Sequence, residues 1–201
     1  MEGGAPIRYR LIRQHGKPVI LGKKVHYVGG NLARAWGEVF ETFGLEVKQW
    51  NAVLLMGMGA SLIQLLAQSQ HPPSSLLVLE IDSEMVRLQE THFRLPLPYK
   101  VVLGDAAQTI YGIEGSYDGI FIDVFIEDEV PLAFLCPPFV EAVRRRLAPY
   151  GLLFWNVLRR QESVQVGELL KQAFRVVRQW RYEGHAFWAA AHEFDAFPTP
   201  F

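Results

Sequence analysis

Residues 52–82 read AVLLMGMGASLIQLLAQSQHPPSSLLVLEID, a helical pattern between two apolar runs. The first run, 52–59, ends in glycines; residues 60–70 have helical spacing and stop before Pro72-Pro73; the second run is 75–82. Strands that are apolar throughout are typical of a parallel sheet whose two faces are covered by connecting helices. The stretch therefore predicts a strand–helix–strand unit of a parallel sheet.

The same alternation of strands and helices continues along the rest of the chain. Further strands are predicted at 99–105, 117–125 and 151–158, and further helices at 83–93, 138–148 and about 162–173. Two consecutive strands, 174–182 and 184–194, follow with a tight turn at Glu183-Gly184. Because no helix separates these last two strands, one of them must be antiparallel. We therefore predict an α/β fold with a Rossmann-like, doubly wound, seven-stranded sheet and an antiparallel C-terminal strand.

The first 48 residues have a different pattern, with short β-prone pieces interrupted by glycines. Residues 7–31 predict a small hairpin or meander, and residues 32–43 have the spacing of a helix that Gly44 ends. We predict an N-terminal β-hairpin and helix extension over 1–48 and a Rossmann-like domain over 49–201.

Composition narrows the classes of function. The chain has 201 residues, half of them hydrophobic, and a net charge of −1, so no broad basic surface favours nucleic acid. A single cysteine, Cys136, excludes an internal disulfide and a thiolate zinc cluster, and no metal site is predicted. We find no apolar run long enough for a membrane helix or a signal peptide, so we expect a cytoplasmic protein without a membrane partner.

Glycines and acids stand at the ends of four predicted strands. They are Gly57-Met58-Gly59, Glu80 with Asp82, Gly104-Asp105-Ala106, and Asp123. Each feature by itself has a simpler interpretation. For example, Asp82 could serve simply as the N-cap of the following helix. Because the carboxyl ends of parallel strands form the ligand site of such sheets, all four features together predict a site for a nucleoside-type cofactor.

The glycine segment distinguishes between cofactors. A dinucleotide site usually has a third glycine where this chain has Leu62, so a cofactor without phosphates fits better. S-adenosylmethionine is such a molecule. Its methionyl part could lie along the glycine turn, its ribose beside Glu80 and its adenine near Asp105.

Five segments together resemble the spermidine synthase-like branch of the S-adenosylmethionine-dependent methyltransferase superfamily. They are VLLMGMGAS (53–61), LLVLEIDSEMV (76–86), VVLGDAAQTI (101–110), YDGIFIDVF (117–125) and RRRLAPYGLLFWNVL (144–158). The resemblance implies that Glu80 binds the ribose, that Asp105 lies by the adenine amino group and that Asp123 faces the reacting amine.

The predicted site follows from these positions. The cofactor-binding residues are Gly57, Gly59, Glu80, Ile81, Asp105 and Ala106; Asp123 is the catalytic residue; Asp123 and Asn156 contact the substrate. Asn156 is included because it stands near the end of a strand, and Tyr27, His26 and Trp155 are weaker candidates. The acids Glu127, Asp128 and Glu129 either attract a cationic substrate or form a solvated loop.

Departures from the family pattern shape the predicted reaction. The loop 56–61 lacks the aspartate that holds the amino end of the cofactor in spermidine synthases, and Ile126 stands where they have a second aspartate. We therefore expect methyl transfer from S-adenosylmethionine to a small, cationic, amine-bearing molecule. Aminopropyl transfer from decarboxylated S-adenosylmethionine is the alternative, and a non-catalytic interaction protein is a third interpretation. The apolar N-terminal pieces and the aromatic tail 187–201 suggest a homodimer.

Overall fold

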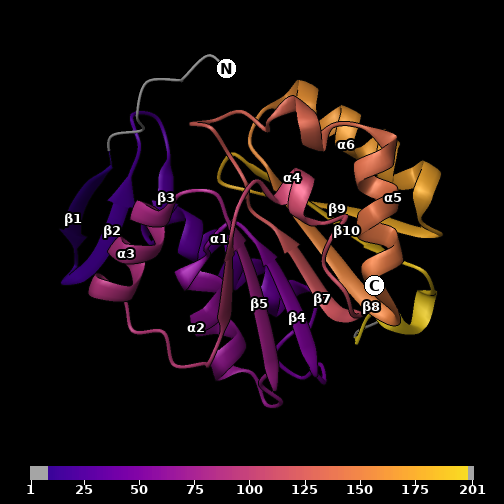
Figure 1. The fold of residues 1–201 in the computed structure, drawn as a ribbon, viewed down its shortest axis with the longest axis horizontal. Coiled ribbons are helices and arrows are strands. Elements are labelled where there is room, and N and C mark those ends of the chain that lie inside the picture. Colours follow the sequence, from indigo (N-terminus) through magenta and orange to yellow (C-terminus); the bar gives the residue numbers. More distant parts are fainter. Residues whose placement is uncertain (1–8, 199–201) are drawn as a thin grey trace.

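Seven strands form the large sheet of the computed structural model, which describes residues 9–198. They are β4 (Ala52–Met56), β5 (Ser75–Glu80), β6 (Lys100–Leu103), β7 (Tyr117–Ile122), β8 (Leu147–Val157), β9 (Val176–Tyr182) and β10 (His185–Ala191). Their order is β6-β5-β4-β7-β8-β10-β9 (Figure 1). The pairs from β6 to β8 are parallel, and β10 is antiparallel to both β8 and β9. The predicted fold class is therefore confirmed.

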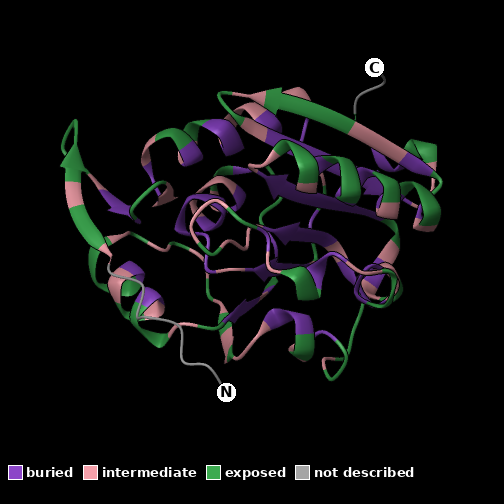
Figure 2. Ribbon diagram, turned by 90° about the horizontal axis from the view of Figure 1, so that it is seen from above, coloured by how far each residue is buried: buried purple, intermediate pink, exposed green. Residues whose placement is uncertain are grey.

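Helices cover both faces of this sheet. They are α1 (Gly30–Thr42), α2 (Ala60–Gln68), α3 (Ser83–His92), α4 (Ala106–Thr109), α5 (Pro137–Arg146) and α6 (Arg160–Ala173), with short 3-10 turns η1 (Leu132–Phe134) and η2 (Phe194–Ala196). Apolar residues of α1 and α2 pack in one core on one face, and those of α5 and α6 pack in a second core on the other face. Buried residues accordingly fill the strands in the middle of the molecule, coloured purple in Figure 2.

A separate three-stranded antiparallel sheet precedes the large one. Its strands are β1 (Arg10–Gln14), β2 (Lys17–Leu21) and β3 (His26–Val28), which confirms the predicted meander (Figure 1). The helix that follows, α1, packs into the core of the large sheet. Its Trp36 is fully buried and packs against two phenylalanine rings. The distances between ring centroids are 5.8 Å to Phe121 and 4.8 Å to Phe187. The boundary at residue 48 stays a prediction, but residues before it contribute to the main core.

The reversal of strand order places the site. Strand β4 lies between β5 and β7. The chain therefore forms β5 and β6 on one side of β4 and then crosses to the other side to form β7. Gly57 follows β4 with φ of 87°, and a Cβ atom there would lie 2.4 Å from the carbonyl oxygen of Asp123. A glycine is therefore required where β4 and β7 end side by side. Ligands of open α/β sheets bind beyond such a crossing point.

The C-terminal tail packs in the core within its described part. Phe187 and Trp188 are buried in β10, and Phe197 lies 5.8 Å from the ring of Phe43. These side chains are not available for an interface, while Phe201 lies outside the described residues. Phe194 of the same tail is exposed, and the homodimer stays a prediction. None of the helices between residues 9 and 198 has the length and apolar character needed to cross a membrane.

Candidate cofactor and catalytic site

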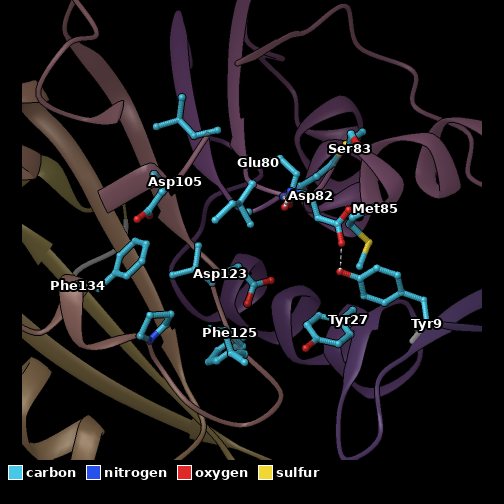
Figure 3. Close-up of a pocket in the computed structure, with 18 residues that line it drawn as sticks. Tyr9, Tyr27, Glu80, Asp82, Ser83, Met85, Asp105, Asp123, Phe125 and Phe134 are labelled. Atoms are coloured by element: carbon cyan, nitrogen blue, oxygen red, sulfur yellow. Dashed lines mark hydrogen bonds between the residues drawn. The ribbon is translucent and has the colours of Figure 1, made fainter. Parts of the chain in front are cut away.

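A cavity of about 510 Å³ opens at the carboxyl ends of β4, β5, β6 and β7 (Figure 3). Six of the predicted site residues line it: Gly57, Glu80, Ile81, Asp105, Ala106 and Asp123. Gly59 and Asn156 are not among the lining residues. Glu80, Asp105 and Asp123 come from three strand ends and lie around the same cavity (Figure 3). The sheet thus brings together acids that are far apart in the sequence.

Two buried side chains hold the glycine loop after β4. Glu80 is 8% exposed; its Oε2 accepts the Met58 N–H at 2.7 Å and its Oε1 accepts the Asp82 N–H at 2.9 Å. Gln89, which is fully buried on α3, accepts the Ala60 N–H at 2.7 Å and donates its Nε2 to the Met58 carbonyl. Burial raises the pKa of Glu80, and the backbone N–H groups oppose that rise. These contacts therefore fix the conformation of the loop.

Asp82 and Asp105 act as helix caps and also line the cavity. Asp82 accepts the Glu84 N–H at 2.8 Å, and Asp105 accepts the Ala107 N–H at 2.9 Å. The simpler interpretation of Asp82 was therefore correct, but it does not exclude contact with a ligand, because both carboxylates face the cavity. The second oxygen of Asp82 accepts the Tyr9 hydroxyl at 2.7 Å.

Asp123 stands just after β7, and each of its carboxylate oxygens accepts one side-chain hydrogen bond. Trp36 Nε1 donates to Oδ2 at 2.9 Å, and Asn156 Nδ2 donates to Oδ1 at 2.9 Å. Burial raises the pKa of Asp123 to about 6, and the two hydrogen bonds limit the rise. Asn156 is fully buried and contacts Asp123 from behind. Its predicted contact with substrate stays a prediction.

The acidic loop after Asp123 is neutralised by cationic partners. Both Asp128 and Glu129 pair with Arg159, at 3.1 Å and 2.6 Å, and Asp128 also pairs with Lys24 at 3.2 Å. Glu127 accepts the Lys23 and Lys24 backbone N–H groups, each at 3.0 Å. None of the three acids lines the cavity. The three acids therefore do not form an unpaired anionic patch, and they are more than a solvated loop. Through Lys23 and Lys24, Glu127 and Asp128 connect the β2–β3 turn to the loop beside the site.

Aromatic side chains form the opposite wall of the cavity. Tyr9 and Tyr27 come from the N-terminal region, with ring centroids 5.5 Å apart in an edge-to-face arrangement (Figure 3). The Tyr27 hydroxyl accepts the Glu127 N–H at 2.8 Å. Of the weaker candidates, Tyr27 therefore lines the cavity. His26 instead accepts the Asn31 N–H, and Trp155 is buried against Phe139.

Sequence reasoning missed several residues of this site. Trp36, Gln89, His185 and Tyr9 hold or line it, although none stands at the end of a parallel strand. A tryptophan on a helical apolar stripe, such as Trp36, is indistinguishable by sequence from an ordinary core residue. The contacts that give these side chains their roles are made only after the chain has folded.

Comparison with known proteins identifies the fold. No protein-family model matches the chain, and no curated protein sequence matches it. A probable spermidine synthase from Corynebacterium glutamicum matches with a TM-score of 0.75 and 20% identity, over 92% of this chain and 77% of that one. A spermidine synthase in complex with the transition-state analogue AdoDATO also has a TM-score of 0.75, with 13% identity over 97% and 75%. Human methyltransferase-like protein 13 in complex with SAH has a TM-score of 0.66 and 19% identity, over 85% and 86%.

These identities are low, so the likeness establishes the fold and nothing finer. The chain has the Rossmann-like fold that spermidine synthases and S-adenosylmethionine-dependent methyltransferases share, as the resemblance in sequence implied.

The two hydrogen bonds on Asp123 predict how its pKa responds to substitution. Trp36→Phe removes one donor to the carboxylate, so the pKa of Asp123 should rise from about 6 by about one to two units. The measurement is the pH dependence of the Asp123 carboxyl ¹³C shift. Trp50→Phe is the matched control, since that buried indole donates to the Leu45 carbonyl. Equal pKa values in both variants would contradict the assigned role of Trp36.

Proposed function

We propose that this chain is a group transferase that uses a cofactor of the S-adenosylmethionine type and acts on a small amine-bearing molecule. The charge of the cavity carries the proposal. Four carboxylates line it, those of Glu80, Asp82, Asp105 and Asp123, and no lysine, arginine or histidine is among the described lining residues. A sulfonium and an ammonium are both cations, so such a cavity favours both partners of the reaction.

The lining residues fit an adenosyl cofactor. The volume of about 510 Å³ lies within the range of about 300–1,000 Å³ that is usual for ligand pockets. Each carboxylate oxygen of Glu80 accepts one backbone N–H, from Met58 and from Asp82. The remaining lone pair on each oxygen can accept a hydrogen bond from a ribose hydroxyl. Asp105 would accept the adenine amino group. Gly57 leaves the backbone accessible for the rest of the cofactor.

A dinucleotide fits this loop less well. Pyrophosphate binding relies on free backbone N–H groups at the turn between strand and helix. Here the Met58 and Ala60 amides are already bound, by Glu80 and Gln89 respectively. Leu62 is buried, so it fills the position at which a third glycine would allow close helix packing. These contacts support a cofactor without phosphates.

Asp123 is suited to act as general base. The bound cofactor would supply an electrophilic carbon attached to a positively charged sulfur. With a pKa near 6, Asp123 is mostly ionised at neutral pH and can accept a proton from an attacking amine. Trp36 and Asn156 fix the orientation of its carboxylate before substrate arrives, which lowers the entropic cost of reaching the reactive geometry.

Methyl transfer is the reaction we propose, because the loop 56–61 lacks the aspartate that the resemblance leads us to expect in a spermidine synthase. One observation favours aminopropyl transfer instead. No cationic side chain in the described lining would pair with the carboxylate of intact S-adenosylmethionine. A non-catalytic protein on this fold remains the third alternative. The three alternatives differ in which ligands bind.

Calorimetry and thermal unfolding separate these alternatives. We expect S-adenosylmethionine and its demethylated product to bind and to raise the melting temperature, since a ligand that binds only the native state stabilises it. NAD is the control and should do neither. Tighter binding of decarboxylated S-adenosylmethionine would favour aminopropyl transfer. If no adenosyl ligand raises the melting temperature at millimolar concentration, the chain is not a transferase of this type.

Glu80→Gln should weaken cofactor binding without unfolding the protein. Glutamine keeps one acceptor oxygen but removes the charge, so we expect a loss of about 10- to 100-fold in affinity. Glu84→Gln is the matched control, because Glu84 is exposed and pairs with Arg87 on the same helix. Titration calorimetry on both variants gives the comparison. An unaltered affinity in Glu80→Gln would remove this residue from the cofactor site.

Asp123→Asn should reduce turnover by about 10²- to 10⁴-fold, as expected for loss of a general base, and leave the cofactor dissociation constant within about twofold. In the unmodified protein, kcat/KM should rise as pH increases through about 6, because the carboxyl group must lose its proton. Asp128→Asn, outside the cavity, is the control and should keep its activity. A fully active Asp123→Asn protein would rule out Asp123 as base.

A further inference from the structure

A chain of hydrogen bonds leads from the last strand pair to Asp123. His185 Nδ1 lies 3.0 Å from Asn156 Oδ1, and Asn156 Nδ2 lies 2.9 Å from Asp123 Oδ1. The amide oxygen of Asn156 has no proton, so His185 Nδ1 must carry the proton that joins them. Each group therefore donates towards the next, and the chain ends on the carboxylate.

The sheet itself aligns these side chains. In the antiparallel pair of β8 and β10, Asn156 lies opposite Phe187, so both side chains point to the same face. His185 is two residues before Phe187 and shares that face, and the two rings stack with centroids 5.7 Å apart. Phe187 in turn contacts Trp36, the other donor to Asp123. His185 is thus held in place by packing as well as by its hydrogen bond.

Burial favours the neutral form of His185. Burial lowers the pKa of His185 to about 4, the nearby Glu183 carboxylate opposes this, and His26 lowers it further. Glu183 is itself paired with Arg34 at 3.3 Å. A neutral imidazole has one ring proton, and the bond to Asn156 assigns it to Nδ1.

On the other side of Asn156, the charges are those of the cavity. Glu80, Asp82 and Asp105 line it together with Asp123, and all of them disfavour a further negative charge. A reversed Asn156 amide would direct its carbonyl oxygen at the Asp123 carboxylate, which would add to that repulsion. The orientation of one buried amide therefore decides whether Asp123 gains a donor or a repulsive neighbour.

We propose that His185 is a positioning residue, whose Nδ1 proton fixes the Asn156 amide so that its N–H₂ group supports the charged, correctly oriented form of Asp123. The consequence for catalysis rests on the proposed function of Asp123 as base. The hydrogen-bond chain does not, because it joins only side chains of the protein.

The Trp36 indole offers a direct reporter of Asp123. Its N–H donates to Oδ2, so its chemical shift in ¹H–¹⁵N spectra should follow the ionisation of the carboxyl group. The chain has five tryptophans, and Trp36→Phe identifies the signal by its loss. In the ligand-free protein the midpoint should lie at about 6. Asn156→Leu, which removes the donor itself, should raise it by about one to two pH units.

His185→Phe keeps a ring to stack on Phe187 and removes the N–H group. We expect the midpoint to rise in the same direction as in Asn156→Leu. His185→Gln can again donate to Asn156 Oδ1, so it should return the midpoint towards the unmodified value. In the double variant His185→Phe/Asn156→Leu the midpoint should equal that of Asn156→Leu alone, because His185 acts through Asn156.

His192→Phe is the matched control, because that half-buried ring contacts Phe174 and lies outside the chain of hydrogen bonds. If His185→Phe does not fold, His185→Leu removes the same proton. An unchanged midpoint in the folded His185 variant, or a double variant whose shift is the sum of both, would overturn the proposal.

Failure of this inference differs from failure of the proposed function. The titration uses no cofactor or substrate, so a chain that binds neither can still confirm the role of His185. If the chain is an active transferase, His185→Phe should also move the acidic limb of the kcat/KM profile to higher pH and leave cofactor affinity unchanged. A purely structural role would lower the melting temperature and leave that limb in place.

Discussion

The part-buried carboxylate of Asp123 imposes the main constraint on this molecule. Removing a charge from water is costly unless each oxygen finds a donor. Here the donors come from opposite parts of the chain: Trp36 from the helix before the large sheet, and Asn156 from β8 after it. His185 on β10 then holds Asn156. The N-terminal helix and the C-terminal hairpin are therefore tied to the same group at the end of β7.

Acids serve two opposite purposes around this point. Asp128 and Glu129 meet Arg159, and Asp128 also meets Lys24, so their charges are largely compensated and their role is to hold the loop. The four carboxylates of the cavity have no basic side chain among its described lining residues. The presence or absence of basic partners therefore distinguishes acids that hold a loop from acids that can bind a ligand, better than the number of acids does.

The glycine loop shows how one residue can meet a structural and a functional demand. Glu80 closes the loop by accepting the Met58 amide, and it still presents lone pairs to the cavity. Gln89 accepts the Ala60 N–H two residues further along the turn. Side chains of the protein therefore fix the conformation of the loop. The fold alone serves many chemistries, so function must be argued from such contacts.

The sequence by itself determined the order of strands and helices, the antiparallel ending and the meander before the sheet, because periodicity and glycine turns are local properties. It also identified Glu80, Asp105 and Asp123, since the ends of parallel strands must converge. Only the tertiary structure decided that Asn156 supports Asp123 from behind, that Trp36, Gln89 and His185 brace the site, and that the acids after Asp123 are paired. These roles depend on partners 29 to 104 residues away. Which distant donor reaches which buried acceptor is fixed by packing, and no local pattern encodes it.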